Sequence, residues 1–288
     1  MTEQKGRLPV TVIPHHYDLQ YKKIDLERHV FDGVLTMHAT VPSPTNRTSL
    51  LLHSLELQIV SCTLNESNES KDEQWSGIEY RYNIPQQTVE IVFDDFAGWK
   101  EGAAYTIKIH FTGILNDQMR GLYRSTYIGL DGKPHTMATT QFEATDARRA
   151  FPCLDEPAHK ATFQLTVSIP PHLQGISNTP FESVYTTYLG NNQSVKTIQY
   201  QKTPKMSTYL LALVVGDFDA ISKTSPAGIQ TTVYTIPGKA HQGTFCLETA
   251  TKCLDLYQTL FNIPYPLTKS DLLAIPDFAA GAMENWGA

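Results

Sequence analysis

Apolar and polar residues alternate along several stretches in the first two-thirds of the chain. Leu35, Met37 and Ala39 are separated by Thr36 and His38. A period of two places one set of side chains on a core and the other set in water, so each such stretch predicts a half-buried β-strand. The same period recurs at Tyr105, Ile107, Ile109 and Phe111, and again at Phe163, Leu165, Val167 and Ile169.

Further strands are predicted at 51–59, 89–93, 195–200 and 209–215. Polar loops rich in Asn, Ser, Gly and Pro, such as 42–48 and 65–77, separate the strands. Many short strands with polar turns predict a mainly β fold, built as an antiparallel β-sandwich or a saddle of sheets.

The pattern changes after Phe218. Residues 222–228 are turn-rich and without periodicity, which predicts a linker. A strand at 231–236, a helix over 240–261 and a short strand at 272–275 are expected to follow. The helix is expected to bury one face, because apolar residues recur every three or four positions, at Leu247, Ala250, Leu254, Tyr257 and Phe261.

This change predicts two domains, a β-sandwich over 1–218 and the start of a second domain over 219–288. One helix leaves much of a sheet uncovered. About 70 residues is also marginal for an independent core. Our interpretation is that the chain stops within the second domain.

Composition narrows the class of protein. The chain has 288 residues, a net charge of −6 and a hydrophobic share of 41%. Interspersed charges of this balance favour a soluble protein and argue against a general nucleic-acid surface. The apolar run 210–215 is too short to cross a membrane, so no membrane partner is expected.

A cytoplasmic location is the expectation. The N-terminal segment 1–7 lacks an apolar stretch of the kind found in signal peptides. The four sequons, at Asn46, Asn65, Asn68 and Asn192, are interpreted as chance occurrences in polar loops. Four cysteines are too few for a disulfide scaffold, and Cys246 and Cys253 are expected to pack as small hydrophobic residues on the helix.

Several kinds of catalytic motif are absent from the sequence. It contains no G-x-S-x-G, no G-x-x-x-x-G-K-[ST] and no H-E-x-x-H. His15 and His16 are adjacent in a predicted strand and point to opposite faces, so they are not expected to share a metal. We therefore assign no catalytic residue and no metal ligand to this chain.

Two segments carry candidate chemistry. In the first, 139–157, Gln141 and Glu143 lie two residues apart, hence on one face if the segment is extended. The mixed-charge run that follows is typical of a solvated loop with weak local pairing among Asp146, Arg148, Arg149, Asp155 and Glu156. The second segment, 281–285, contains a carboxylate and an amide. The alternative interpretation, without a functional role, is an ordinary tight turn.

Taken together, these segments resemble the M1 family of zinc aminopeptidases. The resemblance covers nearly the whole chain, through Pro-His-His-Tyr-Asp-Leu at 14–19, Gly-Leu-Tyr-Arg-Ser at 121–125, Gln-Phe-Glu-Ala at 141–144, the run 148–157 and Gly-Ala-Met-Glu-Asn at 281–285. Five motifs in the family's order, ending in its exopeptidase motif, are far more specific than any one of them.

The resemblance implies a role for each matching residue. Glu284 is expected to hold the α-ammonium of a peptide substrate, with Glu143 sharing that contact and Gln141 lining the pocket for the first side chain. Gly281 and Ala282 are expected to contact the substrate backbone. Asn285 is expected to brace the motif, and Met283 either borders the pocket or packs in the core.

The resemblance also implies what lies beyond this chain. In the family, a zinc site of the H-E-x-x-H type follows in a thermolysin-like α+β catalytic domain. The expectation is that Zn²⁺ is the cofactor of the full-length enzyme, that the missing C-terminal portion supplies its ligands, and that this chain alone is inactive.

Two other functions stay open at this point. A non-catalytic M1-like scaffold or interaction module would keep the fold but would not need an ammonium site. A carbohydrate-binding β-sandwich would need exposed aromatic side chains, for which Trp75 and Trp99 are candidates.

Overall fold

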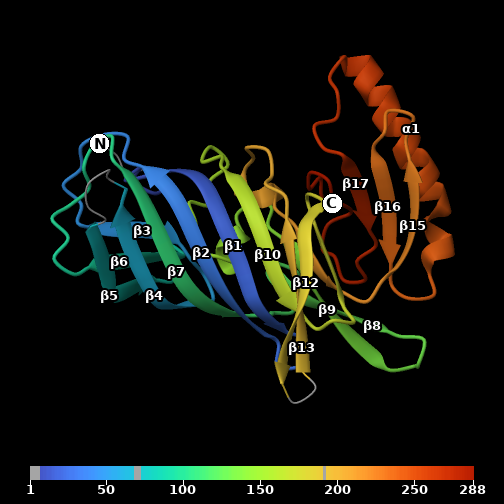
Figure 1. Cartoon of the computed structure of the whole chain (residues 1–288), viewed down its shortest axis with the longest axis horizontal. Coiled ribbons are helices and arrows are strands. Elements are labelled where there is room, and N and C mark those ends of the chain that lie inside the picture. Colours follow the sequence, from blue (N-terminus) through green and yellow to red (C-terminus); the bar gives the residue numbers. More distant parts are fainter. Residues whose placement is uncertain (1–6, 68–72, 191–192) are drawn as a thin grey trace.

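The fold is described from a computed structural model of the chain. The structure describes residues 7–67, 73–190 and 193–288. Residues 1–6 and the sequon residues Asn68 and Asn192 lie outside these ranges. The described part is mainly β, with three sheets arranged along the length of the molecule (Figure 1).

The largest sheet has ten strands in the order β12-β13-β10-β1-β2-β7-β4-β5-β6-β3. Neighbouring strands in this sheet run antiparallel, except that β1 and β10 run parallel. Its strands are β1 (Ile13–Asp25), β2 (Val30–Thr40), β3 (Ser49–His53), β4 (Leu57–Glu66), β5 (Glu73–Asn83), β6 (Thr88–Phe93), β7 (Ala104–Ile114), β10 (Thr162–Ile169), β12 (Phe181–Gly190) and β13 (Gln193–Tyr200).

The predicted alternation is confirmed in this sheet. Leu35, Met37 and Ala39 of β2 are buried, and His38 between them is exposed. β7 and β10 alternate in the same way. The expected single strand at 51–59 is wrong, because Ser54–Glu56 separate β3 from β4 and Glu56 adopts a positive φ of 59°.

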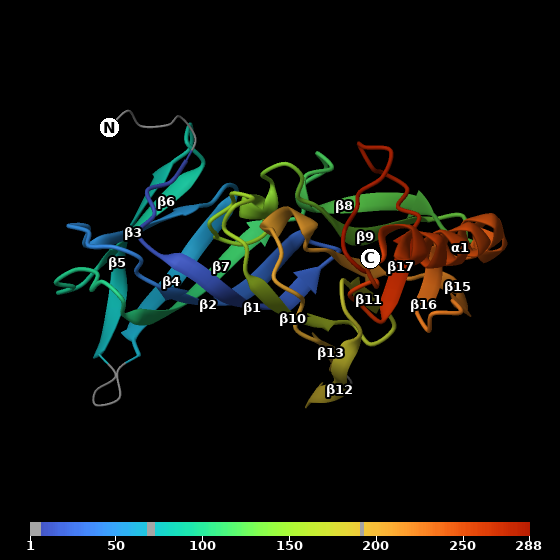
Figure 2. The same cartoon turned by 90° about the horizontal axis from the view of Figure 1, so that it is seen from above.

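A second sheet of four strands, in the order β11-β14-β9-β8, lies between the large sheet and the C-terminal region (Figure 2). Its strands are β8 (Gly121–Ile128), β9 (Pro134–Gln141), β11 (Gln174–Ser177) and β14 (Leu213–Gly216), and short 3₁₀ turns lie at η1 (Ala147–Arg149) and η2 (Thr208–Leu210).

This second sheet is buried on both faces. In β14, Leu213 and Val215 join the large core, whereas Val214 joins a smaller core on the opposite face. In β9, Ala138 joins the large core and Met137 joins the smaller one. Burial on both faces explains the apolar residues 213–215 of β14, because no position in such a strand faces water.

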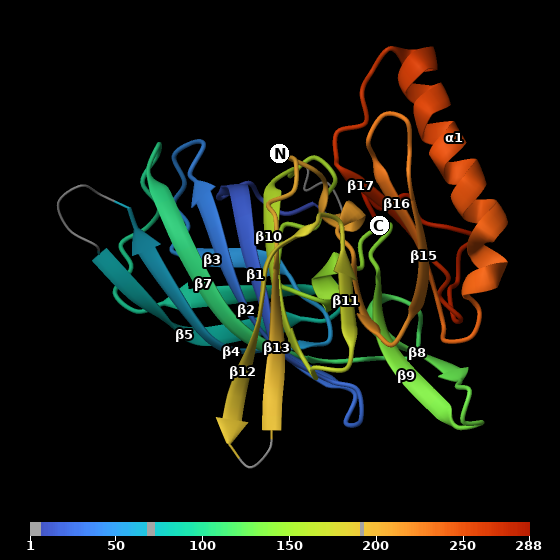
Figure 3. The ribbon, with the colours of Figure 1, turned by 45° about the vertical axis from the view of Figure 1, so that its right-hand side comes forward.

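The C-terminal region forms a third sheet covered by one long helix (Figure 3). The sheet order is β15-β16-β17, with β16 and β17 parallel. The elements are β15 (Asp219–Thr224), β16 (Gln230–Thr235), η3 (Ala240–Gly243), α1 (Thr244–Phe261) and β17 (Lys269–Leu273). The predicted linker at 222–228 is wrong, since its first three residues complete β15 and the rest turn the chain into β16.

The helix lies where it was predicted, but the prediction that its whole apolar face is buried is wrong. Leu247 and Thr251 are buried, whereas Tyr257 and Phe261 are 53% and 63% exposed. The helix therefore packs on β15 and β16 mainly through its first turns. Cys246 is exposed, so the expectation that it packs as a small hydrophobic residue is also wrong.

Candidate functional site at the junction of the second sheet and the C-terminal segment

Gln141 is the last residue of β9 and one of the predicted site residues. Its side chain is 7% exposed, and its Nε2 donates to Sδ of Met283 over 3.7 Å. This contact brings the N-terminal segment 139–157 against the C-terminal segment 281–285, although 142 residues separate the two partners. Gln141 Oε1 is buried and has no hydrogen-bond partner among the described residues. A buried amide oxygen without a partner is costly, and so marks a place where a donor is missing.

Glu143 does not share a face with Gln141 in the way that an extended segment would require. The strand ends at Gln141, and a turn begins at Glu143, closed by a 2.8 Å bond from Asp146 N to Phe142 O. Glu143 is exposed, as is Glu284. Neither carboxylate has a hydrogen bond or ion pair within the described part of the chain, so both are available to a ligand.

The segment 281–285 has no regular secondary structure. Gly281 and Ala282 are exposed, and no atom lies within 4 Å of where a Cβ on Gly281 would stand. Met283 is half-buried and packs against the large core. Asn285 Nδ2 donates to the carbonyl oxygen of Leu210 over 3.0 Å, a contact of the kind that bracing requires.

A cavity of about 810 Å³ lies next to this segment. Its lining includes Gly281, Ala282 and Met283, together with Thr139 and Thr140 of β9. Gln141, Glu143 and Glu284 are not among its lining residues. The cavity therefore borders residues 281–283 of the predicted site but does not include its two carboxylates.

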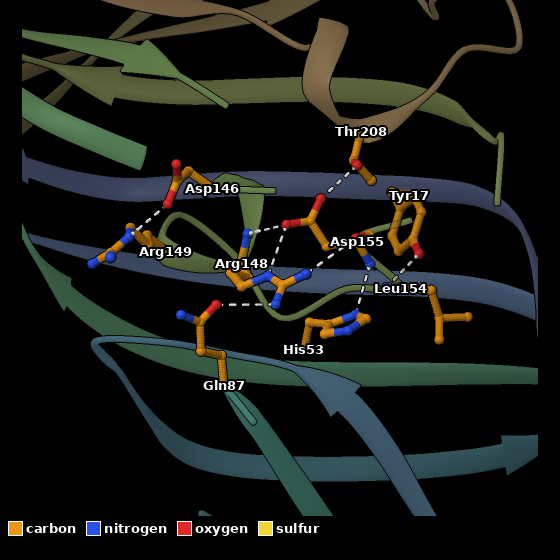
Figure 4. A network of polar contacts seen from close by, with 9 residues as sticks. All are labelled: Tyr17, His53, Gln87, Asp146, Arg148, Arg149, Leu154, Asp155 and Thr208. Atoms are coloured by element: carbon orange, nitrogen blue, oxygen red, sulfur yellow. Dashed lines mark hydrogen bonds and ion pairs between the residues drawn. The ribbon is translucent and has the colours of Figure 1, made fainter. Parts of the chain in front are cut away.

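The charged run after Glu143 is not a solvated loop, contrary to the expectation from its composition. Arg148 Nε lies 3.0 Å from Asp155 Oδ2, and the two side chains are only 9% and 1% exposed. Arg148 also bonds Gln87, and Thr208 donates to Asp155 over 2.7 Å (Figure 4). Burial raises the pKa of the Asp155 carboxyl, against the opposing effect of Thr208 and Arg148.

His53 closes this network from β3. The backbone N–H of Asp155 donates to His53 Nδ1 over 3.1 Å, so the neutral ring carries its proton on Nε2 (Figure 4). Burial, together with the positive charges of Arg148 and His159, lowers the pKa of His53 to about 3. Pattern analysis missed His53 and Gln87, because both lie far from 148–155 in sequence. The network stabilises the chain directly after Glu143.

The described residues do not fit a zinc site. Within residues 7–67, 73–190 and 193–288, no three His, Cys, Asp or Glu side chains gather in a way that could hold a metal ion. Two imidazoles, His16 and His38, do lie opposite each other on β1 and β2, but without a third ligand. The aromatic residues proposed for carbohydrate binding are also unsuited, because Trp99 is 5% exposed and Trp75 packs against Phe96.

Comparison with known proteins identifies the family of the chain. The sequence model described as the Peptidase M1 N-terminal domain matches residues 13–210, and that described as the Peptidase family M1 domain matches residues 245–288. The chain therefore belongs to the peptidase M1 family.

Curated relatives match along nearly the whole chain. Aminopeptidase M1-B of Oryza sativa is 42% identical over 98% of this chain and 30% of its own length. Puromycin-sensitive aminopeptidase of Caenorhabditis elegans and endoplasmic reticulum aminopeptidase 1 of Homo sapiens are each 39% identical over 98% of this chain. The chain spans about 30% of the length of these relatives. No α-helix among the described residues combines the length and apolar character that a membrane span requires.

Proposed function

We propose that this chain is the part of a zinc-dependent aminopeptidase that recognises the free amino-terminus of a peptide. Glu143 and Glu284 hold the α-ammonium group, and Gln141 lines the pocket for the first side chain. The observation that carries the proposal is the contact of Gln141 with Met283, because it joins the two segments that bear the carboxylates.

Electrostatics explains why such a site selects free amino-termini. Two carboxylates directed at one point repel each other when the site is empty, and a bound ammonium removes that repulsion. An internal peptide bond brings no cation. It would leave the carboxylates desolvated and unpaired, at a cost of several kcal/mol.

Gly281 and Ala282 contact the substrate backbone in this proposal. The space around Gly281 lets an extended peptide approach edge-on, in the manner of an added strand. The substrates are thus peptides with a free amino-terminus, and no nucleic acid or membrane partner is involved. The domain division proposed for this activity is 1–218 and 219–288.

Hydrolysis requires residues that this sequence does not contain. Because no H-E-x-x-H is present, zinc binding and general-base catalysis belong to the remaining portion of the enzyme, and this chain by itself is inactive. Metal analysis of the purified chain combined with a fluorogenic aminoacyl substrate tests this point. Stoichiometric zinc with sustained turnover would contradict it.

The anchor itself is testable in this chain without hydrolysis. Leucinamide carries an α-ammonium, and N-acetyl-leucinamide is a matched ligand without the charge. In NMR titrations, leucinamide should shift the amide signals of Glu143 and Glu284, and the acetylated ligand should not. Glu143→Gln and Glu284→Gln should each weaken binding about tenfold or more, as expected for loss of one partner of an ion pair.

Glu27→Gln serves as the control, because Glu27 is an exposed carboxylate in the turn between β1 and β2. Equal binding of the two ligands, or equal effects of all three substitutions, would remove the support for an ammonium site. The scaffold alternative would then be the better assignment, since it requires no such selectivity.

A reducing compartment such as the cytoplasm is the proposed location. All four cysteines, at 62, 153, 246 and 253, are free thiols. Free thiols at exposed positions such as Cys246 are typical of reducing compartments. Quantifying reactive thiols in protein purified without reductant tests this, and an intermolecular disulfide in the native cell would contradict it.

A further inference from the structure

The segment 277–287, which we name the anchor segment, follows β17 as irregular chain. Its middle carries the exposed residues Gly281, Ala282 and Glu284. Irregular exposed chain is usually mobile, because few contacts oppose its conformational entropy. Here, however, both ends of the segment form hydrogen bonds with the N-terminal β-sheets.

The first end is held at Asp277 by β8. Asp277 Oδ2 accepts from Thr126 N over 2.9 Å and from Ser125 Oγ over 3.1 Å. Asp277 N donates back to Ser125 Oγ over 3.1 Å, and the hydroxyl of Tyr123 donates to Asp277 O over 2.6 Å. Burial, and then the charge of Asp277, raise the pKa of Tyr123, so this hydroxyl keeps its proton.

The second end is held by Asn178, which follows β11. Asn178 is 1% exposed. Its Nδ2 donates to Trp286 O and to Leu210 O, each over 2.8 Å, and its Oδ1 accepts from Ala212 N over 2.8 Å. One buried amide therefore fixes the anchor segment to the chain that enters β14.

The residue after Trp286 shows how close this approach is. Gly287 has a φ of +77°, and a Cβ there would lie 2.0 Å from Asn178 O. The carbonyl oxygen of Gly287 accepts from Lys269 Nζ over 2.6 Å and from Asp271 N over 3.1 Å. Only glycine fits between Asn178 and β17. The end of the anchor segment is therefore held by Asn178 on one side and by β17 on the other.

We propose that Asp277 and Asn178 are positioning residues of the α-amino anchor. They fix the two ends of the anchor segment on the N-terminal sheets, and thereby hold Met283 against Gln141 and set the position of Glu284. The inference rests on the proposed function for its link to ligand binding. The hydrogen bonds on which it depends are independent of that function.

The experiment compares Asp277→Ala, Asp277→Asn and Asn178→Ala in this chain by hydrogen–deuterium exchange and by leucinamide titration. Both alanine variants should speed exchange of amides 278–286 by about tenfold or more, and leave amides 150–160 unchanged. Both should weaken leucinamide binding about fivefold or more, because a mobile Glu284 loses its preorganisation. Asp277→Asn keeps an acceptor for Ser125 and Thr126, and should restore both properties.

Two further measurements make the result specific. Trp286 is 37% exposed. In Asn178→Ala its side chain should become more accessible, so acrylamide should quench its fluorescence more strongly. Asp219→Ala is the matched control, because Asp219 accepts from a backbone N–H of Gly238 within the C-terminal region but does not contact the anchor segment. It should leave exchange at 278–286 and leucinamide binding at wild-type values.

Each outcome supports or overturns the inference. Unchanged exchange at 278–286 in both alanine variants overturns it, as does faster exchange with unchanged leucinamide binding. If Asn178→Ala does not fold, the Asp277 pair alone decides. If the wild-type chain does not bind leucinamide, the proposed function fails, and local loss of protection in Asp277→Ala still shows that Asp277 holds the segment.

Discussion

The N-terminal sheets and the C-terminal region of this chain use apolar and charged residues in opposite ways. In the N-terminal part, large side chains such as Phe111 and Phe163 are fully buried, and the ion pair of Arg148 with Asp155 lies inside the protein. In the C-terminal region, Phe245 and Phe261 of α1 are 82% and 63% exposed. Its ion pair of Lys223 with Glu248 is also exposed.

This difference shows where the rigidity of the candidate site originates. The anchor segment belongs to the C-terminal region by sequence, yet its hydrogen bonds through Asp277 and Asn178 run to the N-terminal sheets. Glu143 likewise leaves a strand whose two faces are both buried, and enters a turn followed by the Arg148–Asp155 network. A well-packed part of the chain thus supports candidate site residues that lie on irregular chain.

The largest expected contrast is between two phenylalanines. Phe111→Ala should lower the free energy of unfolding by about 3–5 kcal/mol, because the cavity would open among Tyr21 and Phe31. Phe261→Ala should change it by less than about 0.5 kcal/mol, since the ring is mostly in water. Urea denaturation followed by circular dichroism measures both. Similar losses would show that α1 is as well packed as the sheets.

The two ion pairs provide the next comparison. Arg148→Met leaves Asp155 buried without its cation, and should cost about 3–5 kcal/mol at neutral pH. Lys223→Met removes an exposed partner and should have no measurable effect on stability. Chemical denaturation at pH 7 is the measurement. A small effect of Arg148→Met would mean that Asp155 is protonated in the native protein.

Acid should destabilise the N-terminal network through His53. The native ring stays neutral down to about pH 3, whereas the unfolded ring takes up a proton near pH 6.5. The unfolded state therefore binds more protons between these values, and stability present above pH 6.5 is lost as the pH falls. Between pH 7 and pH 5 the loss should be about 2 kcal/mol.

This effect is isolated by comparing wild type with His53→Gln, which cannot titrate. The difference in unfolding free energy between the two proteins should shift by that amount from pH 7 to pH 5. A constant difference across the range would show that His53 is not buried as a neutral ring.

The smallest contrast is between two glycines of the C-terminal region. Gly287→Ala should cost about 1–2 kcal/mol, because the residue has a positive φ and a Cβ would collide with Asn178 O. Gly281→Ala should cost less than about 0.5 kcal/mol, since the space around it is open. Thermal unfolding measures both. Equal losses of stability at the two positions would show that the end of the anchor segment is not held closely against Asn178.

Alternation of apolar and polar residues predicted the strands that have one buried face and one solvent-exposed face. The strands containing Leu35, Ile107 and Leu165 were predicted from alternation alone, because their opposite faces differ in solvent exposure. Patterns failed where neighbours decide the environment. Tyr209 and Leu210 form a 3₁₀ turn rather than a strand, and residues 222–224 pair with β16 rather than linking two domains.

The candidate site shows the same division. Motif similarity selected Gln141, Glu143 and the residues 281–285, because the types and order of residues are visible in the sequence. It did not predict the burial of Arg148 and Asp155, since composition cannot distinguish a solvated charge from one that is enclosed by His53, Gln87 and Thr208.

The sequence by itself determined the mainly β class, the strands with strict alternation and the membership of the M1 family, because these depend on short-range periodicity and on residue identity. Only the tertiary structure decided that Gln141 meets Met283 and that Asp277 and Asn178 hold the segment between them. The physical reason is that these bonds join residues more than a hundred positions apart. Their formation depends on how three sheets pack, which no local pattern encodes.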